Sequence, residues 1–364
     1  MPLLARTVTT PLAIDIRRGA VVALGQILAD RRISAGGDVA IVVGPGQGDR
    51  IADLLRPSLG GADVFTVSGG SVEAALELGE KIRGGSYDAV VGIGGGKTID
   101  TAKYAATRYA LPMVSVATSL AHDGIASPVA SLDHGGGKGS YGVHIPIAVV
   151  VDLDFVVAGP RRQTRAGIGD ALSNLSAVAD WELANRVRQE PLDGLALTLA
   201  RTGAEALLHH PGRIGTGADD STQDDFLRVL AEALVLGGLA MSVCGSSRPS
   251  SGGCHEISHA IDHLFPHTAA HGEQVGLGAL FCTFLRVSRG LEDGGRFTQL
   301  SDALGRHGLP RVPGDLGLSP AQFAEAVVRA PGTRPDRYTI LEHVGLGFDD
   351  ALATVKEYVD AVGD

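Results

Sequence analysis

Several features are scarce in this 364-residue sequence, and each scarcity narrows the class of protein. Cysteine occurs only at 244, 254 and 282, which argues against a disulfide framework and fits a reducing cytoplasm. Basic residues do not exceed acidic ones: the net charge is −10, so a global basic surface for nucleic acid or anionic membrane is not expected. The first 19 residues lack the long apolar core of a signal peptide. The longest uncharged helical stretch, 233–247, is too short for a membrane span and predicts a buried helix. We therefore expect a cytoplasmic protein.

Glycine is abundant, with 51 residues, and its distribution fits many tight turns between strands and helices. Short apolar runs at 39–43, 89–93, 112–117 and 145–151 alternate with helical periodicity at 71–83 and 97–109, a rhythm typical of a parallel sheet covered by helices. Beyond Pro160 the pattern is almost wholly helical, with candidate helices at 165–188, 190–210, 222–245, 252–264, 271–289, 295–307, 320–329 and 349–362. The sequence predicts an α/β domain over 1–160 and an all-helical domain over 161–364, and the cleft between two such domains is the usual place for a ligand.

A glycine-rich turn, GIGGGKTID at 92–100, follows one predicted strand and opens the next helix. Backbone N–H groups around Lys97 and Thr98 would point outward with positive partial charge, an arrangement that binds phosphate or pyrophosphate. Val91 breaks the Walker A pattern, and Lys97 stands where the Rossmann fingerprint needs its third glycine. The alternative is a flexible turn without a ligand.

Five of the twelve histidines lie at 255, 259, 263, 267 and 271. The first three share one helical face, and Pro266 should place the last two in a loop and the next helix. Histidines that converge from separate segments are a common way to build a transition-metal site. The alternative is a set of partly exposed histidines without a common role.

Asp170 is the charged residue of an otherwise uncharged helical stretch, 166–179. A buried carboxylate is costly unless it is paired or coordinated, so Asp170 is the best candidate for an anionic metal ligand. A local cap or salt bridge is the alternative.

The segment His255-Glu-Ile-Ser-His259 also matches HExxH, in which two histidines bind zinc and the glutamate acts as the base of a peptidase. Asp262 and Phe265 break the longer metzincin pattern, and a peptidase has no use for a phosphate-binding turn. A peptidase therefore remains a minor hypothesis, and replacing Glu256 by Gln would abolish it but spare a dehydrogenase. No GxSxG elbow supports an α/β-hydrolase.

Taken together, these segments resemble the sn-glycerol-1-phosphate dehydrogenase family, within the iron-containing alcohol dehydrogenase and dehydroquinate synthase-like superfamily. The resemblance is carried in order along nearly the whole chain by 94–104 (GGGKTIDTAKY), 118–128 (TSLAHDGIASP), 167–174 (GIGDALSN), 251–259 (SGGCHEISH), 271–278 (HGEQVGLG) and 334–341 (RPDRYTIL).

The resemblance implies a dinucleotide-binding α/β domain and a helical domain that holds the metal and substrate. It implies a divalent metal, usually zinc, held by Asp170, His255 and His271. Asp123 and His259 would face the substrate. The nicotinamide cofactor would be lined by Gly94, Gly95, Gly96, Lys97, Thr98, Ile99, Asp100, Thr118, Ser119, Leu120, Ala121 and Ser127.

The expected reaction is reduction of a ketone phosphate, dihydroxyacetone phosphate, to sn-glycerol 1-phosphate, with hydride from the nicotinamide and a metal acting as Lewis acid. The alternatives are a carbocycle-forming lyase of the dehydroquinate synthase type that uses NAD transiently, and a dehydrogenase for another polyol or aldehyde. Residues 44–46 (GPG) after the 39–43 strand carry no acid to repel a 2′-phosphate, so both NAD and NADP are expected to bind. We also expect a homo-oligomer.

Overall fold

The chain forms two compact units, Met1–Pro160 and Arg161–Asp364. The computed structural model describes residues 8–55, 62–135, 137–214 and 220–363. The first seven residues, which belong to the segment that argues against a signal peptide, lie outside the described residues. The three cysteines are free.

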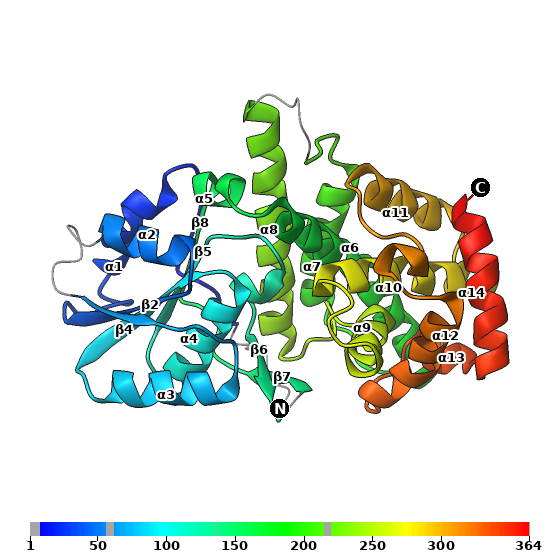
Figure 1. Cartoon of the computed structure of the whole chain (residues 1–364), viewed down its shortest axis with the longest axis horizontal. Coiled ribbons are helices and arrows are strands. Elements are labelled where there is room, and N and C mark those ends of the chain that lie inside the picture. The colour runs from blue at the N-terminus through cyan, green and yellow to red at the C-terminus, as the bar shows by residue number, and fades with distance from the viewer. Residues whose placement is uncertain (1–7, 56–61, 136, 215–219, 364) are drawn as a thin grey trace, which may run out of the picture. The chain divides into compact units, whose positions relative to one another are not determined.

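The first unit is built on a six-stranded parallel sheet with the order β1-β8-β5-β4-β2-β3. Helices cover it on both sides, α1, α2 and α5 on one face and α3 and α4 on the other (Figure 1). The elements are β1 (Ala13–Arg17), η1 (Ala20–Ala23), α1 (Leu24–Leu28), β2 (Asp38–Val43), α2 (Gln47–Leu55), β3 (Asp63–Thr66), α3 (Val72–Arg83), β4 (Tyr87–Gly94), α4 (Gly96–Arg108), β5 (Met113–Ala117), η2 (Asp123–Ile125), β6 (Val129–His134), β7 (Gly137–Gly142), β8 (Ala148–Asp152) and α5 (Leu153–Ala158).

The central strands are apolar without alternation because both faces of the sheet are covered. Every residue of β5 and β8 is buried. One face, which includes Val91, Val114 and Val150, packs on Leu24 of α1 and other residues of α1, α2 and α5 in a single apolar core. The α/β class predicted from the alternating apolar runs is confirmed.

Local signals place α3 as predicted, since the hydroxyl of Ser71 caps it by accepting a hydrogen bond from the Ala74 N–H at 3.1 Å. Sequence analysis missed the edge strands β1 and β3 and the antiparallel hairpin β6–β7. It also missed the short helices α1, α2, α5 and α13 (Ile340–Val344). These elements are short, polar or glycine-containing, so hydrophobic periodicity carries little information about them.

Among its described residues, the second unit contains helices and no strands. This confirms the predicted helical C-terminal part. Its elements are α6 (Arg161–Arg188), α7 (Gly194–His209), α8 (Asp220–Cys244), α9 (Gly253–Leu264), α10 (His271–Ser288), α11 (Gly294–Arg306), η3 (Pro313–Leu316), α12 (Pro320–Arg329), η4 (Ala330–Thr333), α13 and α14 (Phe348–Gly363). Helix α6 is buried along most of its length, and α10 packs directly along it.

Helix α8 is the one element of the described chain whose length and composition would suit a membrane span. Over Ser221–Cys244 the mean hydropathy of its most apolar window is 1.8, but 67% of that window is buried inside the structure. It packs against α7 and α6. This burial is that of a core helix, as the uncharged stretch at 233–247 predicted.

His307, which follows α11, should make stability depend on pH. The residue is 2% exposed, its ring stacks on Phe226 with centroids 5.0 Å apart, and neither ring nitrogen has a hydrogen-bond partner in the described part of the chain. Burial, then the charge of Arg306, lowers its pKa from 6.5 to about 4. As the pH falls from 6.5 toward 4, His307 becomes protonated in the unfolded chain but not in the folded chain. The folded state therefore loses stability over this range.

We expect the drop in the free energy of unfolding between pH 7 and pH 5 to shrink by about 2 kcal/mol in His307→Phe. Urea denaturation of both proteins at the two pH values measures this difference. An equal pH dependence in the variant would contradict the assignment.

Candidate active site

In the first unit, the loops after β2, β4 and β5 meet at the carboxyl edge of the sheet. These strands are neighbours, and the chain order reverses direction between β2 and β4. Such a switch point is where open α/β sheets bind ligands. Gly94 ends β4 with φ +157°, Gly95 caps α4, and Gly96 is the first residue of that helix.

The glycines at this edge allow backbone and side chains to approach closely. A Cβ on Gly44, after β2, would lie 2.1 Å from the Thr98 hydroxyl oxygen, and a Cβ on Gly96 would lie 2.0 Å from Nε2 of His122. The N–H of Thr118 donates to the carbonyl of Gly94 at 3.0 Å, which joins the β5 loop to the glycine turn. The turn is thus packed tightly rather than loose.

The predicted cofactor residues fall into two groups by burial. Lys97 is exposed, and Gly95, Gly96 and Ala121 are partly exposed. The other predicted positions are buried: Gly94, Thr98, Ile99, Asp100, Thr118, Ser119, Leu120 and Ser127.

Asp100 has a clear internal partner, the fully buried Lys103, at 3.0 Å. The ammonium of Lys103 also donates to the carbonyls of Gly124 and Ser127, at 2.8 and 3.2 Å. Through these hydrogen bonds, the buried Asp100–Lys103 pair attaches the loop that carries Asp123 and Ser127 to α4. Sequence reasoning did not single out Lys103, although it stands one helical turn beyond Asp100.

In the second unit, Asp170 of α6, His255 of α9 and His271 of α10 converge. One ligand atom from each lies within 4.8 Å of the other two. Nε2 of His271 is 3.7 Å from Oδ1 of Asp170, and the two imidazole centroids are 5.1 Å apart. Of the other predicted histidines, His263 and His267 are exposed and stand outside this triad, while His259 lies one turn along α9 from His255.

A hydrogen-bond chain fixes the tautomer of His271. The amide nitrogen of Gln274 donates to Asp262 at 2.9 Å, so its oxygen accepts from the Ser258 hydroxyl at 2.6 Å. Because the Ser258 hydroxyl donates its proton to Gln274, its oxygen accepts a hydrogen bond from the Nδ1–H of His271, 3.2 Å away. In the neutral ring this leaves the lone pair on Nε2, 3.7 Å from the Asp170 carboxylate, and two electron-pair donors side by side suit a shared cation.

His255 is suited to the same role. Burial, then the charges of His259, Arg334 and Arg337, lowers the pKa of His255 well below its ordinary value, so the ring is neutral at neutral pH as a metal ligand must be. The start of α9 is anchored by Asp180 of α6, whose carboxylate accepts from the Gly253 N–H at 2.8 Å and from the Arg286 guanidinium at 2.9 Å. One carboxylate and two imidazoles fit zinc or ferrous iron and leave coordination positions open.

The HExxH match does not describe this site. Glu256 is fully buried, and its carboxyl accepts a hydrogen bond from Thr339 at 3.2 Å. Burial, then the nearby Glu342, raises the pKa of Glu256 to about 8, so it is largely protonated at neutral pH. Nε2 of His259 accepts from the Arg334 guanidinium at 3.2 Å. The triad uses only the first histidine of the motif.

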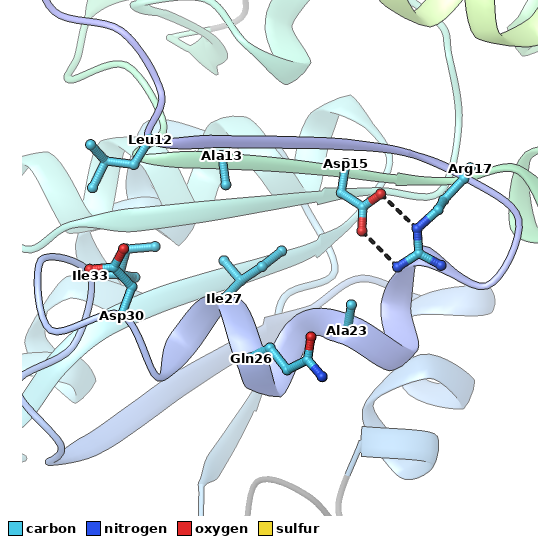
Figure 2. Close-up of a pocket in the computed structure, with 9 residues that line it drawn as sticks. All are labelled: Leu12, Ala13, Asp15, Arg17, Ala23, Gln26, Ile27, Asp30 and Ile33. Carbon is cyan, nitrogen blue, oxygen red and sulfur yellow. Dashed lines mark hydrogen bonds and ion pairs between the residues drawn. The ribbon is translucent and has the colours of Figure 1, made fainter.

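A separate surface pocket of about 320 Å³ lies in the first unit, beside the edge strand β1 (Figure 2). Leu12, Gln26 and Ile27 are among its lining residues, and Asp15 and Arg17 pair at its rim at 2.9 Å. None of the predicted site residues lines it.

Comparison with known proteins agrees with this fold. Residues 15–160 match the family model described as iron-containing alcohol dehydrogenase. A probable glycerol dehydrogenase from Sinorhizobium meliloti superposes with a TM-score of 0.77 at 21% identity, covering 98% of this chain and 99% of that one. Glycerol dehydrogenase from Schizosaccharomyces pombe gives 0.72 at 22%, covering 98% and 92%. The fold is that of the iron-containing alcohol dehydrogenases.

Relatives with higher sequence identity define a more specific enzyme family. Glycerol-1-phosphate dehydrogenase [NAD(P)+] from Methanosarcina mazei is 35% identical over 93% of this chain and 92% of the relative. The enzyme of the same name from Hyperthermus butylicus is 36% identical over 94% and 95%. The chain belongs to the glycerol-1-phosphate dehydrogenase family, as its motifs suggested.

Proposed function

We propose that this protein is a metal-dependent, NAD(P)-linked dehydrogenase that interconverts dihydroxyacetone phosphate and sn-glycerol 1-phosphate. The single observation that carries the proposal is the convergence of Asp170, His255 and His271 within 4.8 Å, in a chain whose relatives are named for this activity. Those relatives favour a dehydrogenase over a carbocycle-forming lyase or a peptidase.

The chain's own residues have distinct tasks in this reaction. The triad would hold the ion, and Ser258 and Gln274 would keep the ring of His271 in the coordinating tautomer. When bound, a divalent metal supplies a Lewis acid for the substrate's carbonyl oxygen. His259 is assigned to proton transfer near the substrate, and Asp123 to a substrate contact. Zinc is the proposed metal because two imidazoles and one carboxylate are a usual set for catalytic zinc.

The glycine turn and the Thr118–Ala121 loop are the proposed seat of the nicotinamide cofactor. The N–H groups at the start of α4 would receive the pyrophosphate, with Lys97 exposed beside them. Gly44, Pro45 and Gly46 follow β2 without an acidic side chain, which supports use of both NAD and NADP. A cytoplasmic homo-oligomer is proposed as the working form.

The direct test is reduction of dihydroxyacetone phosphate by zinc-loaded protein with NADH or NADPH. We expect oxidation of either nucleotide, and a product that a dehydrogenase specific for sn-glycerol 3-phosphate does not oxidise. Loss of turnover on chelation, with recovery on added zinc, is the second expected result. Zinc-loaded protein that oxidises neither nucleotide with this substrate would overturn the proposal.

A further inference from the structure

Three arginines gather beside His259 in the second unit, from separate parts of the chain. Arg334 donates to Nε2 of His259 at 3.2 Å and to the Ser247 hydroxyl at 3.3 Å. Arg337 donates to the same hydroxyl at 2.7 Å and to the carbonyl of Ser251. Arg248, next to Ser247, is buried, and its charge acts on Arg337. Arg334 and Arg337 thus contact one short stretch, 247–251, which contains Arg248 and leads into α9.

The protein balances the charges of this cluster only in part, because Asp336 and Glu256 interact electrostatically with Arg334 and Arg337 without pairing directly with either. Arg248 is neutralised by Glu190, with two hydrogen bonds of 2.7 and 2.8 Å. Arg334 and Arg337 donate to an imidazole, a hydroxyl and a carbonyl, and no carboxylate of the described chain lies within ion-pairing distance of either. Burial, then Arg334 and Arg248, lowers the pKa of Arg337 to about 10, so it remains a cation at neutral pH. Two partly buried cations that have no carboxylate in ion-pairing contact favour the binding of an external anion.

The arginine cluster lies close enough to the proposed metal site for one substrate molecule to contact both. His259, which touches Arg334, is four residues from the triad residue His255 on the same helix, a rise of about 6 Å. In a triose phosphate, one methylene and one ester oxygen separate the carbonyl carbon from phosphorus. A substrate of that size can therefore reach both the triad and the guanidinium groups. Arginine is well suited to phosphate because its planar group donates two parallel hydrogen bonds.

We propose that Arg334 and Arg337 form the subsite for the substrate's phosphate and give the enzyme its preference for a phosphorylated ketone over the free one. This assignment rests on the proposed function. Ser247 is a positioning residue, because its hydroxyl accepts from both guanidinium groups and holds them together.

The test compares dihydroxyacetone phosphate with dihydroxyacetone, which lacks only the phosphate. Arg337→Gln and Arg334→Gln are each measured in the zinc-loaded enzyme, with Arg329→Gln, an exposed arginine at the end of α12, as the control. We expect KM for the phosphorylated ketone to rise about 100-fold in either variant. For dihydroxyacetone, kcat/KM should stay within about threefold in Arg337→Gln, and Arg337→Lys should recover part of the loss.

Inorganic phosphate supplies a readout that does not depend on turnover. Calorimetric titration of phosphate into the zinc-loaded protein should show binding in the wild type and the control, and at least about tenfold weaker binding in the two variants. Folded variants with wild-type phosphate affinity and wild-type KM would overturn the subsite. An equal loss for both ketones would also overturn it, since that pattern marks a disturbed triad. A wild type that binds phosphate through these arginines but reduces neither ketone would instead contradict the proposed function and leave the subsite standing. If Arg337→Gln fails to fold, Arg337→Lys and the wild-type titration still decide the matter.

Discussion

Loss of either Asp170 or His271 is expected to remove the metal and reduce kcat/KM by about 10³-fold or more. Each supplies one of three donors within 4.8 Å, and an ion that polarises a carbonyl contributes several kcal/mol to transition-state stabilisation. Asp170→Asn keeps the size of the side chain but removes its charge, and His271→Ala removes the imidazole. Zinc content by elemental analysis and steady-state turnover measure the two effects.

His263→Ala is the matched control, because His263 lies on the same helix as His255 but is exposed and outside the triad. It should retain one zinc per chain and wild-type turnover. Stoichiometric zinc and full activity in Asp170→Asn would show that the ion is held elsewhere.

The second large effect is expected at Gly272, where α10 touches α6 through backbone alone. A Cβ on Gly272 would lie 1.8 Å from the carbonyl oxygen of Ala166, and a Cβ on Gly169 would lie 2.1 Å from the carbonyl oxygen of Gly272. Because these neighbours are backbone atoms in helices, the helices themselves must separate. Gly272→Ala should therefore destabilise the protein by about 3 kcal/mol.

The same change should weaken zinc binding, since Gly169 precedes Asp170 and Gly272 follows His271. Gly294→Ala is the control: Gly294 is the exposed first residue of α11, and a Cβ there meets nothing within 4 Å. Thermal unfolding and competition with a zinc chelator measure both quantities. Wild-type stability and zinc affinity in Gly272→Ala would show that the helices tolerate the added methyl group.

Much of the architecture was readable in the sequence because it rests on local signals. The buried strands around Val91 and Val114 are apolar runs bounded by turns, and the helices of the second unit have clear periodicity. β1 and β3 were missed because edge strands are short and partly exposed, with burial that does not alternate cleanly. The β6–β7 hairpin was missed because β7, GKGSYG, is rich in glycine and polar residues.

Some residues of the candidate site could likewise be predicted from the sequence, and others could not. Asp170 and the histidines carry a compositional signal, a lone acid in an apolar helix and a run of imidazoles. Their convergence depends on how α6, α9 and α10 pack, which no local pattern encodes. Arg334 and Arg337 lie in the 334–341 segment that resembles the family, but no role followed from that resemblance, since arginine in a loop is usually solvated. Only their burial and the lack of a carboxylate partner in the described chain distinguish them.

All three donors of the triad belong to the unit after residue 160, whereas the glycine turn and its companion loops belong to the unit before it. In the proposed enzyme, ion selectivity and coenzyme preference would therefore be determined by residues of separate units. Substitutions after β2 can retune the choice of nucleotide without altering the donor set, and changes along α6 and α10 can retune the ion without altering the nucleotide loops. This separation lets natural variation adjust the two properties one at a time.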